Sequence, residues 1–70
     1  MYYYYFDKCT DQHVRHAIHT NECPFLARRQ DRVLIGFEFC YYSAIVRAKK
    51  IYPLKNFYGC HYCCRASYIK

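Results

Sequence analysis

Four residues in two short pairs have the types and spacing that bind a metal ion. His19 precedes Cys23 by four positions in "HTNEC", and Cys60 precedes Cys63 by three positions in "GCHYC". Zinc prefers four tetrahedral ligands drawn from cysteine sulfur and histidine nitrogen, and structural sites commonly take them as two close pairs that are distant in sequence. The two pairs therefore predict one structural zinc ion per chain, bound by His19, Cys23, Cys60 and Cys63.

The other cysteines leave alternatives open. Cys64 directly follows Cys63 and could replace it as a ligand, and the six cysteines could instead form disulfides or act as redox thiols. A metal site is favoured because reducing systems keep the cysteines of a cytoplasmic chain as thiols. We expect Cys40 to be a small buried apolar residue and Cys9 to be an ordinary thiol at the end of a strand.

Three histidines, His13, His16 and His19, recur every three residues and raise the question of a second metal site. Successive side chains of a strand point to opposite faces, so His13 and His19 would share one face while His16 would lie on the other. The three rings then cannot converge on one ion. We expect His13 and His16 to be surface residues and His61 to lie beside the zinc site.

The chain has 70 residues, which is the length of one small domain. Domains of this size bury only about 60% of their unfolded surface and are often stabilised by disulfides, a metal or a partner. Ten tyrosines supply much of the apolar content, and their hydroxyl groups still need hydrogen-bond partners. We expect a single domain over 1–70, with a zinc-binding core at 19–63 and an N-terminal strand extension at 1–18.

Hydrophobic periodicity predicts a helix over 42–52 that ends before Pro53, because proline cannot continue a helix. Ser43 is a candidate cap near its start. Apolar side chains at helical spacing predict one buried face, formed by Ala44, Ile45, Ala48, Ile51 and Tyr52.

Three segments ahead of this helix predict strands. "RVLIGFEF" is rich in β-branched and aromatic residues and predicts the central strand, with one face formed by Val33, Ile35, Phe37 and Phe39. "YYYYFDK" and "HVRHAIHT" predict two more, joined by the polar connection "KCTDQ". This order predicts an α+β fold in which one helix packs on a face of a small antiparallel sheet of about three strands.

The order of these segments resembles the metal-binding domain at the N-terminus of Ada, a bacterial alkyl-DNA repair protein, and short bacterial proteins related to it. That pattern runs from a CxxxC or HxxxC pair through an "NRVxF" strand and an alanine-containing helix to a "PCxxC" turn around zinc. Here "HTNEC", "RQDRV", the helix and "GCHYC" correspond to it across 19–63. Asp31 and Gly59 depart from the pattern, and the connection after the helix is longer. The resemblance implies zinc ligands at His19, Cys23, Cys60 and Cys63.

We do not expect the chain to transfer methyl groups as Ada does. In Ada a zinc-bound thiolate of a four-cysteine site takes a methyl group from a DNA phosphotriester. Three thiolates and a neutral imidazole carry one negative charge fewer, so the thiolates are weaker nucleophiles. The five carboxylates are scattered, and no glycine-rich phosphate loop is present. We therefore expect a zinc-stabilised, non-catalytic binding module.

The net charge of +6 favours polyanionic partners. Six basic residues near the predicted central strand and helix are candidates for nucleic-acid binding, and exposed tyrosines could stack on bases; these are Arg28, Arg29, Arg32, Arg47, Lys49 and Lys50. The alternatives are a protein-interaction module without a nucleic-acid role, and a disulfide or thiol-redox protein. The chain shows no secretory signal and no apolar run of about 20 residues, so we expect a cytoplasmic protein without membrane contact.

Overall fold

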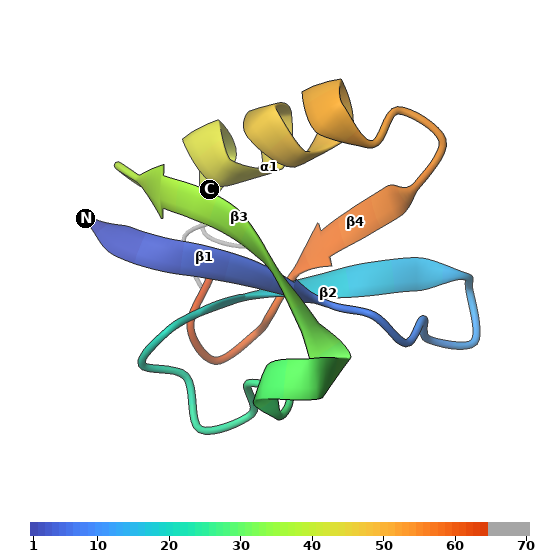
Figure 1. The fold of residues 1–70 in the computed structure, drawn as a ribbon, viewed down its shortest axis with the longest axis horizontal. Coiled ribbons are helices and arrows are strands. Elements are labelled where there is room, and N and C mark those ends of the chain that lie inside the picture. The colour runs from blue at the N-terminus through green and yellow to red at the C-terminus, as the bar shows by residue number, and fades with distance from the viewer. Residues whose placement is uncertain (65–70) are drawn as a thin grey trace.

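A computed structural model describes residues 1–64 as one mixed sheet with a helix on one face (Figure 1). The elements in chain order are the strand β1 (Tyr2–Asp7), the strand β2 (Arg15–Thr20), the 3-10 turn η1 (Arg29–Asp31), the strand β3 (Arg32–Glu38), the helix α1 (Tyr41–Ile51) and the strand β4 (Asn56–Gly59).

The strands lie in the order β3-β1-β2-β4. β1 is antiparallel to both of its neighbours, whereas β2 and β4 are parallel. The predicted α+β class with one helix is confirmed. The prediction of about three antiparallel strands is wrong, because β4 adds a fourth, parallel strand. β4 has only four residues and was too short to show a period.

β3 is an edge strand rather than the predicted central one, and it contains a bulge. Tyr5 pairs with Leu34 and Tyr4 with Gly36, so Ile35 is the extra residue. An extra residue moves the following side chains to the opposite face. Ile35 is therefore buried, whereas Phe37, which was predicted to share its face, is 51% exposed.

Gly36 makes this bulge feasible. Its φ of +155° lies in a region that residues with a side chain rarely adopt. A Cβ there would lie 3.1 Å from the Nε atom of Arg47, which donates a hydrogen bond of 3.1 Å to the Ile35 carbonyl. The helix thus supplies the partner for a carbonyl of the bulged strand.

α1 matches the predicted helix to within one residue at each end. Its N-cap is Cys40, and Ser43 forms the reciprocal half of a capping box, with its hydroxyl accepting from the Cys40 amide. Ala44 and Ala48 are fully buried and let the helix approach the sheet closely, whereas Ile51, predicted on the buried face, is 51% exposed.

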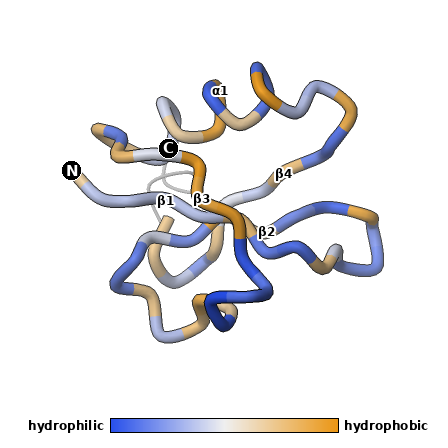
Figure 2. The backbone as a smooth tube through the Cα atoms, viewed as in Figure 1, coloured by the Kyte–Doolittle hydropathy of each residue, from blue (hydrophilic) through white to orange (hydrophobic). Residues whose placement is uncertain are grey.

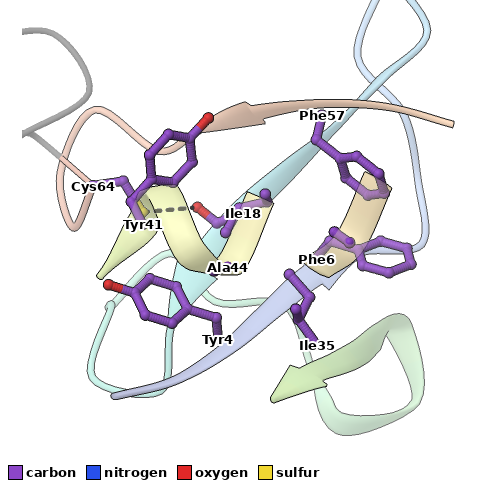
Figure 3. Packing of buried hydrophobic residues seen from close by; sticks show 9 residues of the cluster. Tyr4, Phe6, Ile18, Ile35, Tyr41, Ala44, Phe57 and Cys64 are labelled. Carbon is purple, nitrogen blue, oxygen red and sulfur yellow. Dashed lines mark hydrogen bonds between the residues drawn. The ribbon is translucent and has the colours of Figure 1, made fainter. Parts of the chain in front are cut away.

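The core lies between α1 and the sheet (Figure 3). Phe6 of β1 is at its centre, with edge-to-face contacts to Phe57 and Tyr52 at 5.1 and 5.3 Å between ring centroids. Phe6 and Ile18 are the largest fully buried side chains among the described residues. A hydrophobic core of this size supplies little stability by itself.

Hydrophilic residues gather around η1 and in the β1–β2 connection, away from the helix (Figure 2). Within residues 1–64, no helix combines the length and the apolar character needed to cross a membrane.

Candidate metal centre

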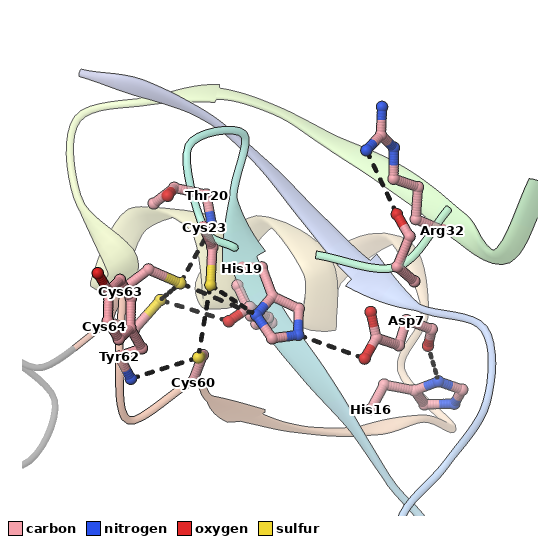
Figure 4. A network of polar contacts seen from close by, with 12 residues as sticks. Asp7, His16, His19, Thr20, Cys23, Arg32, Cys60, Tyr62, Cys63 and Cys64 are labelled. Carbon is pink, nitrogen blue, oxygen red and sulfur yellow. Dashed lines mark hydrogen bonds and ion pairs between the residues drawn. The ribbon is translucent and has the colours of Figure 1, made fainter. Parts of the chain in front are cut away.

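The four residues predicted as metal ligands lie together at one end of the sheet (Figure 4). One potential ligand atom from each of them lies within 4.8 Å of all the others. Three of the residues are buried, and Cys63 is partly buried. The arrangement could hold a metal ion; the residues that form it are His19, Cys23, Cys60 and Cys63.

The parallel pairing of β2 and β4 brings the two ligand pairs together. Parallel neighbours end at the same edge of a sheet, so His19, near the end of β2, lies beside Cys60, which follows β4. The amide of Cys60 extends the pairing with a hydrogen bond of 3.0 Å to the Ile18 carbonyl. Cys23 returns to the same place through a tight turn after β2, in which its amide donates to the Thr20 carbonyl at 3.2 Å.

Two of the ligand-atom distances match those of tetrahedral zinc, and the others lie within 4.8 Å. With Zn–S at about 2.3 Å and Zn–N at about 2.0 Å, tetrahedral angles require about 3.8 Å between two sulfurs and about 3.5 Å between sulfur and nitrogen. The sulfurs of Cys23 and Cys60 are 3.8 Å apart, and the Nδ1 atom of His19 is 3.5 Å from the Cys23 sulfur and 3.9 Å from the Cys63 sulfur. A disulfide is much shorter, at about 2.05 Å between sulfurs.

Two of the three sulfurs also accept a hydrogen bond from a backbone amide. Thr20 donates to Cys63 and Tyr62 donates to Cys60, both at 3.3 Å. The Phe25 backbone acts in the same direction on Cys23, because it lowers the pKa of that thiol. Such bonds favour the thiolate, which is the form that binds metals. The backbone on both sides of the site is therefore arranged around sulfur acceptors.

Asp7 supports His19 from the opposite side of the ring, a contact that the sequence reasoning missed. Its Oδ2 atom lies 3.3 Å from Nε2 of His19. A proton on Nε2 donates to this carboxylate and leaves the Nδ1 lone pair directed toward the three cysteines, as in the carboxylate–histidine–metal arrangements of metal sites. Asp7 and His19 are 12 residues apart in sequence, and the pairing of β1 with β2 brings them together.

The surroundings of Cys23 and His19 favour the protonated form of both groups. Burial is the main cause that raises the pKa of the Cys23 thiol to about 12, and contacts with the sulfurs of Cys63 and Cys60 contribute to the same rise. Burial disfavours the charged form of His19, but contacts with Cys63 and Asp7 outweigh it and raise the histidine pKa. A divalent cation among these groups would reverse the balance, because it deprotonates coordinating thiols.

Cys64 is adjacent to the site without belonging to the group of four. Its sulfur is 3.9 Å from that of Cys63 and 3.4 Å from the Ile18 carbonyl, to which it donates. The contact with Cys63 lowers the pKa of Cys64, and the same contact raises the pKa of Cys63. Cys64 is 2% exposed and belongs to the hydrophobic core, whereas the group of four contains Cys63.

The remaining cysteines lie outside the site. All six fall among the described residues, and each is a thiol there. Cys9 is exposed just after β1, as predicted, whereas the prediction of a buried Cys40 is wrong. Cys40 is exposed because it caps α1, where the Ser43 amide is the main cause of a lowered thiol pKa.

The exposure of the histidines agrees with the prediction at His13 and contradicts it at His16. His13 is exposed, as expected, and His61 is exposed between Cys60 and Cys63. His16 is only 6% exposed, contrary to the prediction, because its ring packs on Phe6 at 5.2 Å and its Nδ1 atom lies 2.7 Å from the Asp7 carbonyl. A satisfied hydrogen bond makes burial of this imidazole feasible.

The six predicted nucleic-acid-binding residues do not form one patch. Arg28, Arg29 and Arg32 lie at η1 and the start of β3, whereas Arg47, Lys49 and Lys50 lie on α1, on the other side of the sheet (Figure 1). Arg47 is also engaged, since it contacts Glu38 at 3.5 Å in addition to the Ile35 carbonyl.

No protein-family model matches the chain, and neither a curated protein nor a solved structure does. These comparisons do not support an Ada-like identification. The structure does contain the histidine–cysteine cluster that the resemblance implies, and this cluster could hold a metal ion.

Proposed function

We propose that this protein is a small binding module held together by one structural zinc ion at His19, Cys23, Cys60 and Cys63. The observation that carries the proposal is that four ligand atoms lie within 4.8 Å of one another, with the Cys23–Cys60 and His19–Cys23 distances equal to those of a zinc tetrahedron. Sulfur-rich tetrahedral sites favour zinc over hard cations such as magnesium and calcium, which prefer oxygen ligands.

The site is suited to a structural role. Structural zinc sites are closed by four protein ligands, whereas catalytic sites keep one position open for water or substrate. Here four protein ligands are available, and amide hydrogen bonds to the sulfurs reduce their nucleophilicity. We therefore propose a non-catalytic role.

The partner that we propose is nucleic acid. The support is the net charge of +6 together with exposed arginines at η1, where Arg28 and Arg29 lie beside Arg32. Positive charge of this size attracts the phosphate backbone over a distance of about one Debye length.

Two measurements test this proposal in sequence. Elemental analysis of the purified protein should give about one zinc per chain, and a folded chain that binds no zinc when zinc is supplied would contradict the structural role. Binding to labelled DNA and RNA should then weaken steeply as salt rises, because phosphate contacts release counterions. A zinc-loaded protein that binds neither DNA nor RNA at low salt would remove the nucleic-acid role and favour a protein partner.

A further inference from the structure

The face of the sheet opposite α1 carries an exposed row of aromatic side chains on β1 and β3. Tyr4 and Phe6 point into the core under the helix, so Tyr3 and Tyr5 point to the other face. The register places Phe37 beside Tyr3. Tyr3 is 48% exposed and Phe37 is 51% exposed, so both offer ring surface to a partner.

The rings of Tyr3 and Tyr5 lie against other planar side chains on this face. Tyr3 and Phe37 lie 4.8 Å apart between centroids at 57°, and the Arg32 guanidinium lies 4.6 Å over the ring of Tyr5. An arginine plane over an aromatic ring can itself receive a base, through stacking and cation–π attraction. Leu34, which pairs with Tyr5 in the sheet, is 51% exposed and extends the apolar surface.

One end of this face is positively charged. The Lys8 amide donates to the Asp31 carbonyl at 2.9 Å, which places Lys8 beside η1 and its arginines. Arg28 is held in this region by Asp31 at 3.7 Å, and its side chain remains 82% exposed. The corner therefore gathers four cations beside two carboxylates, Asp31 and Asp7, of which Asp7 pairs with Arg32 in the sheet; the cations are Lys8, Arg28, Arg29 and Arg32.

We propose that this face binds single-stranded nucleic acid, with bases stacked on Tyr3 and Phe37 and phosphates bound at the basic corner. This inference rests on the proposed nucleic-acid function and assigns it a surface and a substrate class. The bulge at Gly36 makes the surface, because it turns Phe37 away from the core.

A single strand suits this face better than a duplex or a second copy of the chain. Bases in a duplex stack on one another and face inward, whereas the bases of a single strand can stack on aromatic rings. A second copy would bring another chain of net charge +6 against the same corner.

The test uses zinc-loaded protein and fluorescein-labelled oligothymidylate and oligouridylate, with binding followed by fluorescence anisotropy. Phe37→Leu keeps an apolar side chain and removes the ring. Tyr42→Leu is the matched control, because Tyr42 exposes the same 51% of its surface on α1, across the sheet. Loss of base stacking should weaken binding at least about fivefold in Phe37→Leu, whereas Tyr42→Leu should change it less than twofold. Phe37→Tyr, which keeps a ring, should bind like the parent.

Salt dependence measures the basic corner independently. Four phosphate contacts to a single strand give a slope of log affinity against log salt of about −3, and Arg28→Ala should reduce its magnitude by about 0.7. Circular dichroism and zinc content confirm that each variant is folded before its affinity is compared.

Three results would overturn the inference while leaving nucleic-acid binding intact: equal affinity for Phe37→Leu and the parent, a preference for duplex, or an equal loss in Tyr42→Leu. A dimer in sedimentation that Phe37→Leu abolishes would also overturn it, since the occupant would be a second copy. If the parent binds no nucleic acid of any kind, the proposed function itself fails.

Discussion

Replacement of Cys60 by serine tests whether the metal centre holds the fold. Cys60 is 8% exposed, its sulfur lies 3.8 Å from that of Cys23, and it accepts the Tyr62 amide. Apparent zinc binding in small zinc-finger domains is worth about 10–16 kcal/mol, so an equal share for each of four ligands is about 2.5–4 kcal/mol. That share is comparable to the roughly 3–5 kcal/mol that a hydrophobic core of this size supplies.

Cys60→Ser should therefore be close to unfolded at room temperature or melt roughly 10–30 °C below the parent, since 1 kcal/mol shifts the midpoint of a domain this small by about 4–8 °C. Cys9→Ser is the matched control. It also removes one thiol, but from an exposed position outside the site, and should change stability by less than about 0.5 kcal/mol.

Thermal melts followed by circular dichroism, with zinc present and again after a chelator, separate the two variants. The chelator should destabilise the parent strongly and Cys60→Ser much less. The reasoning is refuted if Cys60→Ser melts like the parent, or if the parent melts at the same temperature with and without chelator.

Three further predictions concern residues around the core and the site. Asp7→Asn should lower zinc affinity about 10- to 100-fold in competition with a metal-binding dye, because it weakens the acceptor that orients His19; Asp11→Asn, which lies away from the site, should bind zinc like the parent. Gly36→Ala should lower the urea midpoint by an amount equivalent to about 1–3 kcal/mol, since φ is +155° there, and an unchanged midpoint would contradict the strain argument. Burial raises the pKa of Tyr4 from 10.0 to about 12, so the folded state holds the phenolic proton more tightly than the unfolded state does. The resulting contribution to the free energy of unfolding is complete below pH 10 and should be lost between about pH 10 and 12. Tyr4→Phe should therefore lose less stability than the parent over this window, and an equal loss would exclude Tyr4 as its source.

The four residues of the candidate site could be predicted from sequence because zinc chemistry restricts both residue type and local spacing. The pairs His19 with Cys23 and Cys60 with Cys63 each lie within one turn of chain, and a site of this kind needs two such pairs. The helix could be predicted because its period and Pro53 are local signals. These properties belong to short segments and need no knowledge of the fold.

What sequence could not supply depends on pairing between distant strands. Asp7 reaches His19 only through the β1–β2 register, and Phe37 faces outward only because the bulge at Gly36 shifts its side chain. Strict alternation placed Phe37 in the core, since a single sequence does not reveal which strand residue is left unpaired. His16 was misjudged for a similar reason, because its hydrogen-bond partner is a carbonyl of another strand.

X-ray absorption spectroscopy of the zinc-loaded protein tests the central claim most directly, because it counts the atoms bound to the metal. The four residues predict three sulfurs at about 2.3 Å and one nitrogen at about 2.0 Å, with the scattering pattern of an imidazole ring. His19→Ala should remove the imidazole signal, whereas His61→Ala, in the turn between Cys60 and Cys63, should leave the spectrum unchanged. A shell of four sulfurs, which would require Cys64 in place of His19, or a shell of light atoms alone would contradict the proposed site.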